Sequence, residues 1–153
     1  MKRIIGISLL AILLAIQFIR PERNEGEAAT EMDVTHFVEV PDNVMTVLQS
    51  SCYDCHSNRT NYPWYSNINP VGWWLNNHVE EGKSELNFSD FAQYDVKRMD
   101  HKLEEVAEEV EEGHMPLPAY TWIHREAELS PEQISLIKDW VAAERAKLNV
   151  PAQ

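Results

Sequence analysis

Both cysteines of the chain lie in one pentapeptide, CYDCH at residues 52–56, in which a histidine directly follows the second cysteine. Three kinds of site use two cysteines with this spacing: a redox-active disulfide, half of a zinc site, and the attachment site of haem c. Each of them requires a different fold around it. This pentapeptide therefore limits the possible architectures more than any other stretch of the sequence.

The zinc and redox alternatives lack the residues or the fold that they need. Zinc takes four ligands, usually including a second C-x-x-C or a closely spaced pair of histidines. The chain has no second cysteine pair, and the remaining histidines show no such pairing: His36, His78, His101, His114 and His124. A thioredoxin-like site needs a βαβ unit, but strand patterns are almost absent. The cysteines also follow predicted helical residues instead of opening a helix, where the macrodipole would lower a thiol pKa.

Haem c uses all three side chains of the motif. The thiols of Cys52 and Cys55 each add across one vinyl group of the porphyrin, and the spacing lets both sulfurs reach the ring from one helical turn. The imidazole of His56 then falls under the iron as the proximal ligand. The motif therefore predicts one covalently attached haem c.

The spacing of apolar residues, together with proline and glycine positions, predicts an all-α domain. The expected helices cover residue 42 to the motif, 70–82, 96–112 and 131–148. One apolar stripe marks the third of these helices: Met99, Leu103, Val106 and Val110. Gly113 is expected to end that helix, a proline-rich strap follows, and the SPEQ capping box at 130–133 starts the last helix.

The N-terminus carries a predicted membrane-targeting segment. Two basic residues precede an apolar run that continues to Ile16, so residues 1–20 are interpreted as a signal-anchor or a signal peptide. The A-x-A-like pattern of a cleavage site does not follow the run, which favours an uncleaved anchor. As a helix, residues 4–19 would span about 24 Å, somewhat short of a hydrocarbon core of about 30 Å. Residues 21–41 are expected to form an acidic tether, and residues 42–150 the folded domain.

The charge of the chain excludes one class of partner and suggests another. The formal net charge is -12, and phosphate binding needs the opposite sign, so nucleic acid is not an expected partner. The helix at 96–112 carries much of the acidity: Glu104, Glu105, Glu108, Glu109, Glu111 and Glu112. This surface is explained either by solubility or by docking of a redox partner protein with a basic surface.

Several motifs in combination resemble one known family. The chain contains CYDCHSN, then PWY, then LNFS, and finally MPLPAY, between about residues 42 and 143. This pattern resembles the haem-binding domain family of small bacterial c-type cytochromes, which are membrane-tethered or secreted. The resemblance covers about two thirds of the chain. It implies haem binding and a cytochrome c-like helical domain, but it implies no particular biological role.

The second axial position of the iron has one preferred candidate, Met115. A thioether is a soft ligand that favours ferrous iron, and the prolines at 116 and 118 stiffen the segment that would hold it. His114 and His78 are alternative ligands. Met115 could also be an ordinary core methionine.

Three further residues are candidates for contact with the haem. Trp64 and Tyr120 belong to a group of aromatic residues that would form apolar walls around the ring, and the Tyr120 hydroxyl could bond a propionate. Arg59 lies close to the motif, and its guanidinium suits bidentate pairing with a propionate. Most of these aromatics are equally consistent with plain core packing.

These features together predict an electron carrier and no enzyme. The expected protein is a monohaem cytochrome c with a haem domain in the periplasm, held at the bacterial inner membrane by its N-terminal helix. Release into the periplasm after signal cleavage is the alternative location. The alternative functions are a haem-based sensor with an open or labile sixth position and, less favoured, a peroxidase-like enzyme, for which no acid-base group is marked.

Overall fold

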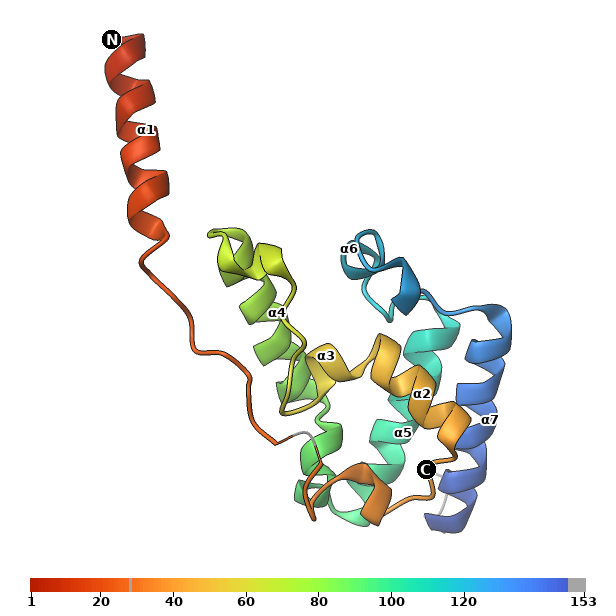
Figure 1. Ribbon diagram of the computed structural model, residues 1–153. Coiled ribbons are helices and arrows are strands. Elements are labelled where there is room, and N and C mark those ends of the chain that lie inside the picture. The colour runs from red at the N-terminus through yellow and green to blue at the C-terminus, as the bar shows by residue number, and fades with distance from the viewer. Residues whose placement is uncertain (28, 149–153) are drawn as a thin grey trace.

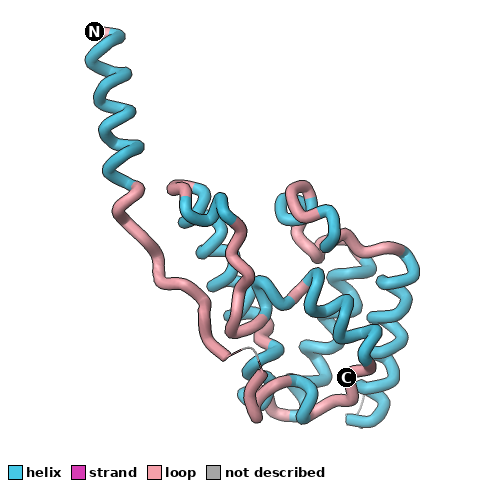
Figure 2. The backbone as a smooth tube through the Cα atoms, in the orientation of Figure 1, coloured by secondary structure: helices cyan, strands magenta, loops and turns pink. Residues whose placement is uncertain are grey.

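The computed structural model describes residues 1–27 and 29–148. In this part of the chain all regular elements are helical, and the single β-bridge joins Glu25 to Arg59. Figure 2 shows helices connected by loops, with no strand in the residues it describes. The all-α prediction is confirmed. Residue 150, at which the folded domain was expected to end, lies outside the described residues.

The described residues form seven α-helices and four short 3-10 helices. The α-helices are α1 (Lys2–Ile16), α2 (Asp42–Ser51), α3 (Tyr53–His56), α4 (Val71–Glu85), α5 (Val96–Glu111), α6 (Pro118–Thr121) and α7 (Pro131–Leu148). The 3-10 helices are η1 (Val34–His36), η2 (Trp64–Asn67), η3 (Phe88–Gln93) and η4 (Arg125–Ala127). The helices expected at 42, 70, 96 and 131 are present, whereas the short α6 replaces part of the predicted strap.

Helix α1 stands apart from the other helices and joins them through an extended segment (Figure 1). It buries none of its side chains. Directly after it, the side-chain amide of Gln17 donates to the Leu13 carbonyl and to the Asn69 carbonyl, each at 2.9 Å. No helix in the described residues is long and apolar enough to cross a membrane, so the predicted N-terminal membrane helix is unsupported.

Residues 21–41, expected to be a tether, are instead partly packed into the domain. Val34 and Val38 are buried in the main core. Asp33 caps η1 by accepting a hydrogen bond from the Thr35 backbone N–H at 3.0 Å, and the Thr30 hydroxyl donates to the Ser89 carbonyl at 2.9 Å. The acidic composition of the segment led to the tether prediction. The two valines lie one helical turn apart and provide enough apolar surface to hold the segment against the core.

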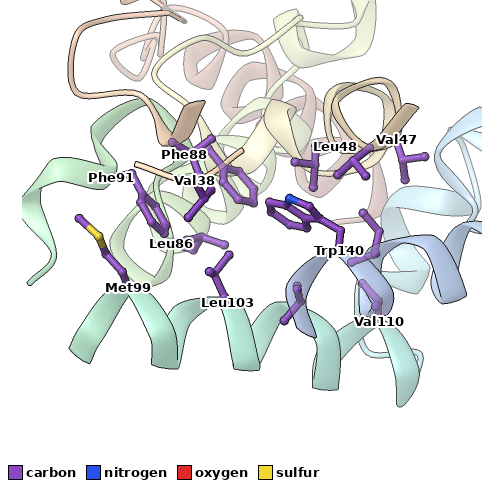
Figure 3. Close-up of a cluster of buried hydrophobic side chains, with 14 of the residues drawn as sticks. Val38, Val47, Leu48, Leu86, Phe88, Phe91, Met99, Leu103, Val110 and Trp140 are labelled. Atoms are coloured by element: carbon purple, nitrogen blue, oxygen red, sulfur yellow. The ribbon is translucent and has the colours of Figure 1, made fainter. Parts of the chain in front are cut away.

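The core lies where α5 and α7 pack side by side and α2 crosses them (Figure 1). Leu48 of α2, Leu103 of α5 and Trp140 of α7 point toward a common centre (Figure 3). The indole N–H of Trp140 donates to the Glu39 carbonyl at 2.8 Å, which satisfies its polar atom inside this core. Since α2 leads directly into the CYDCH motif, its burial positions the motif on a rigid base.

Candidate functional site

The motif forms a single tight turn at the end of α2. Cys52 caps α3, and its carbonyl accepts hydrogen bonds from the backbone N–H groups of Cys55 at 3.1 Å and His56 at 2.9 Å. Both thiols are free. The two sulfurs and the imidazole therefore originate from one helical turn, as the haem c prediction requires.

Helix α4 passes directly beside this turn, and Gly82 makes the close approach possible. A Cβ at residue 82 would lie 3.0 Å from the Cys55 carbonyl oxygen and 3.1 Å from the Cys55 Cβ. The sequence prediction that Gly82 ends the helix is wrong, because α4 continues to Glu85. The glycine is tolerated within the helix because its missing side chain lets the motif pack against α4.

The ring of His56 is oriented by the backbone of the segment that follows α4. Its Nδ1 lies 3.0 Å from the carbonyl oxygen of Leu86. A carbonyl can only accept, so Nδ1 carries the proton and Nε2 keeps its lone pair. Burial lowers the pKa of His56, which favours the neutral imidazole. A neutral ring whose Nδ1–H bonds a carbonyl and whose Nε2 keeps its lone pair is the usual state of a metal-ligating histidine.

The two cysteines are protonated thiols in this environment. Burial raises the pKa of Cys52 to about 12 and that of Cys55 to about 11. Reactive redox cysteines show the opposite shift. The described residues also contain no group of three or more His, Cys, Asp or Glu side chains suited to hold a metal ion. Neither the redox nor the zinc interpretation is supported by these surroundings.

Two cavities adjoin at the motif, with volumes of about 330 Å³ and 250 Å³. Pockets for small ligands and cofactors usually measure about 300–1,000 Å³. The lining residues that the two cavities share are Ser51, Cys52, His56, Glu85, Met115 and Pro116. Leu86, Phe88, Val106 and Val110 extend the first cavity with apolar surface, so the stripe of α5 serves both the core and the site.

Met115 reaches these cavities because the chain reverses after α5. Gly113 adopts a positive φ of 72°, a conformation that glycine adopts without steric cost. The backbone N–H groups of His114 and Met115 then both donate to the Glu109 carbonyl, at 3.0 Å and 3.1 Å. The thiol of Cys52, the imidazole of His56 and the thioether of Met115 thus line both adjoining cavities, and the thiol of Cys55 lines the second. This donor set fits a covalently attached haem with two axial ligands.

The two alternative histidines lie in different surroundings. The imidazole of His114 is exposed, and its Nδ1 lies 3.2 Å from a Glu112 carboxylate oxygen and 3.5 Å from one of Glu109. His78 lines the second cavity, where its Nδ1 bonds the Trp74 carbonyl at 2.8 Å. The structure therefore brings His78, but not His114, into the space that Met115 lines.

Of the three other predicted haem contacts, Tyr120 lies at the site, whereas Arg59 and Trp64 do not. Tyr120 lines the second cavity, but its hydroxyl donates to a carboxylate oxygen of Asp54 at 2.6 Å. Burial raises the pKa of Tyr120, and this hydrogen bond raises it further, so the hydroxyl stays protonated. Arg59 is exposed, and Trp64 is 75% exposed. Within the described part of the chain, neither of these two residues is among those lining the two cavities.

Sequence reasoning missed two charged residues at the site, Lys102 and Glu85. The Lys102 side chain is only 9% exposed, and its Nζ lies 2.6 Å from a Glu105 oxygen and 4.0 Å from one of Glu85. Lys102 lines the first cavity, and Glu85 lines both. The sequence could have indicated the buried position of Lys102, because this residue lies three positions after Met99 and four before Val106, on the apolar face of α5.

Comparison with known families identifies a haem-binding domain. Residues 11–143 match the model of the family described as haem-binding domain, which is well over half of the 153 residues. No curated protein and no solved structure shows significant similarity to the chain. The match confirms the predicted family and supports haem as the cofactor. The chain belongs to the haem-binding domain family.

Proposed function

We propose that this protein is a monohaem c-type cytochrome that transfers electrons and performs no bond chemistry of its own. The observation that carries the proposal is that Cys52, His56 and Met115 line the same two cavities, with Cys55 lining one of them. When bound, the haem supplies an iron that alternates between the ferrous and ferric states. The side chains around the haem attach it, bind its iron and keep water from it.

Cys52 and Cys55 are the proposed thioether anchors, and His56 is the proposed proximal ligand. Support comes from the single turn that carries all three side chains and from the Leu86 carbonyl that fixes the imidazole. Because the carbonyl holds Nδ1, the ring presents the same nitrogen in both oxidation states. Such fixed orientation limits rearrangement during electron transfer.

Met115 is the proposed sixth ligand. It lines both cavities together with His56, whereas His114 pairs with glutamates at the surface. His78 lines only the second of these cavities. A thioether opposite an imidazole favours the ferrous state and raises the reduction potential. The apolar residues of the first cavity, including Phe88 and Val110, would keep water from the iron.

We also propose that residues 1–20 hold the protein at the outer face of the bacterial inner membrane and are not removed. The amide of Asn69, a buried residue, donates to the carbonyls of Ile16 at 2.9 Å and Ile19 at 2.8 Å. The indole N–H of Trp73 donates to the same Ile19 carbonyl at 2.8 Å. Removal of residues 1–20 would remove these acceptors. Release into the periplasm is the alternative.

The proposed redox partner is a protein with a basic surface. Glu105 and Glu109 of the acidic α5 helix both line the first cavity, so this helix brings negative charge close to the proposed haem. Attraction between exposed charges weakens as the Debye length falls from about 30 Å at 0.01 M salt to about 8 Å at 0.15 M. Reduction by such a partner should therefore slow as salt is added, and a rate independent of salt would contradict the docking role.

The test is to produce the full chain in a bacterium that carries out cytochrome c maturation. The denatured protein should keep its colour and have the mass of the chain plus one haem, and replacing both cysteines by alanine should abolish this. The ferric protein should show the weak far-red sulfur-to-iron band. Met115→Ala should lose that band, whereas Met45→Ala, a control on α2, should keep it.

Three results would contradict parts of the proposal. A colourless product with the mass of the bare chain would rule out covalent haem. A high-spin ferric spectrum of the unaltered protein would favour a sensor or ligand-binding role, because it indicates an open sixth position. A band unchanged in Met115→Ala would assign the ligand to another residue.

A further inference from the structure

One of the two residues between the cysteines, Asp54, is hydrogen-bonded to the short helix that follows Met115. Asp54 lies in α3, and one of its carboxylate oxygens accepts a hydrogen bond of 2.6 Å from the Tyr120 hydroxyl in α6. The two residues are 66 positions apart in the chain. This bond therefore connects the proposed proximal side of the site with the segment that carries the proposed distal ligand.

Asp54 is held firmly at its end of this bond. Its other carboxylate oxygen accepts from both the backbone N–H and the side-chain amide of Asn61, each at 3.1 Å. Its backbone carbonyl accepts from the Thr60 hydroxyl at 2.7 Å. The carboxylate therefore has little freedom to follow Tyr120 if α6 moves away.

Tyr120 is also oriented by its neighbours. Its ring stacks on His124 with ring centroids 4.4 Å apart and planes within 16°. The Nε2 of His124 in turn lies 2.6 Å from the Tyr65 hydroxyl. These contacts aim the Tyr120 hydroxyl at Asp54 but do not themselves involve the motif.

The segment between Met115 and Tyr120 has little other packing to hold it. It is tied at one end by the Glu109 carbonyl, which accepts from the Met115 N–H at 3.1 Å. Helix α6 packs chiefly on η4, its own neighbour in sequence, and lies at one end of the domain (Figure 1). Trp122, just after α6, is 73% exposed. Segments with few buried apolar contacts open locally at low cost.

We propose that the Tyr120–Asp54 hydrogen bond is a latch that keeps Met115 on the iron. The inference rests on the proposed function, since it assumes haem with His56 and Met115 as axial ligands. Tyr120 acts as a positioning residue: it ties the Met115 segment to the turn that carries the proximal ligand. Without the bond, the segment opens more often and the thioether leaves the iron more often.

The test uses the full-length holo-protein and imidazole as a competing ligand. In the ferric state, imidazole can bind only when Met115 has left, so the replacement rate reports the fraction of molecules with an open segment. The disappearance of the far-red sulfur-to-iron band follows this rate. Tyr120→Phe should raise the rate roughly 10-fold to 100-fold, the range expected for loss of one hydrogen bond to a charged group.

Tyr62→Phe is the matched control, because it also removes a hydroxyl from a half-buried tyrosine. That hydroxyl accepts a hydrogen bond from the Asn24 backbone N–H at 2.8 Å instead of bonding Asp54. Its imidazole rate should equal that of the unaltered protein. Urea unfolding of both variants measures their global stability. A loss of global stability alone would not raise the replacement rate in Tyr120→Phe and leave it unchanged in Tyr62→Phe.

Asp54→Asn and the double variant with Tyr120→Phe complete the experiment, and they remain informative if one single variant folds poorly. Because one bond joins the two residues, the double variant should be no faster than the faster single variant. Independent, multiplying effects would overturn the latch. The latch would also be overturned if the unaltered protein shows the band and Tyr120→Phe replaces Met115 at the same rate. In that case Met115 ligation would stand. An unaltered protein without the band would overturn both.

Discussion

Phe88 and Phe91 provide a paired test of how the core supports the site. Both side chains are almost completely buried, at 1% and 0% exposed. Phe88 stacks on Tyr53 of the motif with ring centroids 5.3 Å apart, and it lines the first cavity. Phe91 instead packs edge-on against Tyr94 at 5.4 Å. The two residues have equal burial and different neighbours, so stability and site integrity can be separated.

Replacing either phenylalanine by alanine should destabilise the protein by about 3–5 kcal/mol, the usual cost of the lost burial and the remaining cavity. At roughly 2–4 °C per kcal/mol, the melting temperature should fall by roughly 6–20 °C. Only Phe88→Ala should also change the site, because it removes a wall of the cavity and the ring that supports Tyr53. The spectrum of the folded holo-protein should therefore change in Phe88→Ala and stay constant in Phe91→Ala.

Urea unfolding followed by circular dichroism measures the first effect, and the absorption spectrum before unfolding measures the second. A shift of the midpoint at constant slope would show that stability itself has changed. The reasoning would be refuted if Phe88→Ala cost less than about 1 kcal/mol, since a buried ring of this kind cannot be removed so cheaply. Equal spectral changes in both variants would refute the assignment of Phe88 to the cavity wall.

Three further predictions concern α4, α5 and the contact of α5 with α7. Gly82→Val should push α4 away from Cys55 and cost about 1–3 kcal/mol, measured by urea unfolding, with a lower yield of haem-loaded protein; unchanged values would show that the contact is not tight. Arg145→Met should cost about 1 kcal/mol at pH 7. The hydrogen bond from Arg145 lowers the pKa of Asp100, so the stabilisation by this pair is complete above about pH 4 and is lost as the pH falls through the lowered pKa. The urea unfolding curves of the variant and the unaltered protein should therefore converge in acid. A difference in stability that stays constant with pH would contradict this. Lys102→Met removes a positive charge from the cavity lining and should lower the reduction potential measured by redox titration; an unchanged potential would place the lysine outside the influence of the haem.

Features that depend on neighbours in sequence were predictable. The capping box at the start of α7 is present: the Ser130 N–H donates to the Gln133 side chain at 2.8 Å, and the Gln133 N–H donates to the Ser130 hydroxyl at 3.3 Å. The stripe on α5 and the glycine that ends this helix also behave as expected. Each depends on residues spaced no more than about one helical turn from the next, so the local pattern contains the whole cause.

Features that depend on distant segments were not predictable in the same way. Gly82 interrupts helix propensity locally, yet α4 continues because the glycine faces Cys55. Arg59 is close to the motif in sequence but is exposed. Lys102 is far from the motif in sequence and lines the cavity beside His56. Each outcome was set by which side of an element meets another element, and sequence distance does not specify this.

The sequence alone determined the chemistry of the motif, because two thiols and an imidazole on one turn are set by covalent spacing and by hydrogen bonds within that turn. It also determined, to within one residue, where α2, α4, α5 and α7 begin. The tertiary structure decided that Met115 shares a cavity with His56, that Tyr120 bonds Asp54 instead of facing solvent, and that part of residues 21–41 is buried. Those outcomes depend on packing between segments tens of residues apart, where the gain from burying apolar surface outweighs local preference.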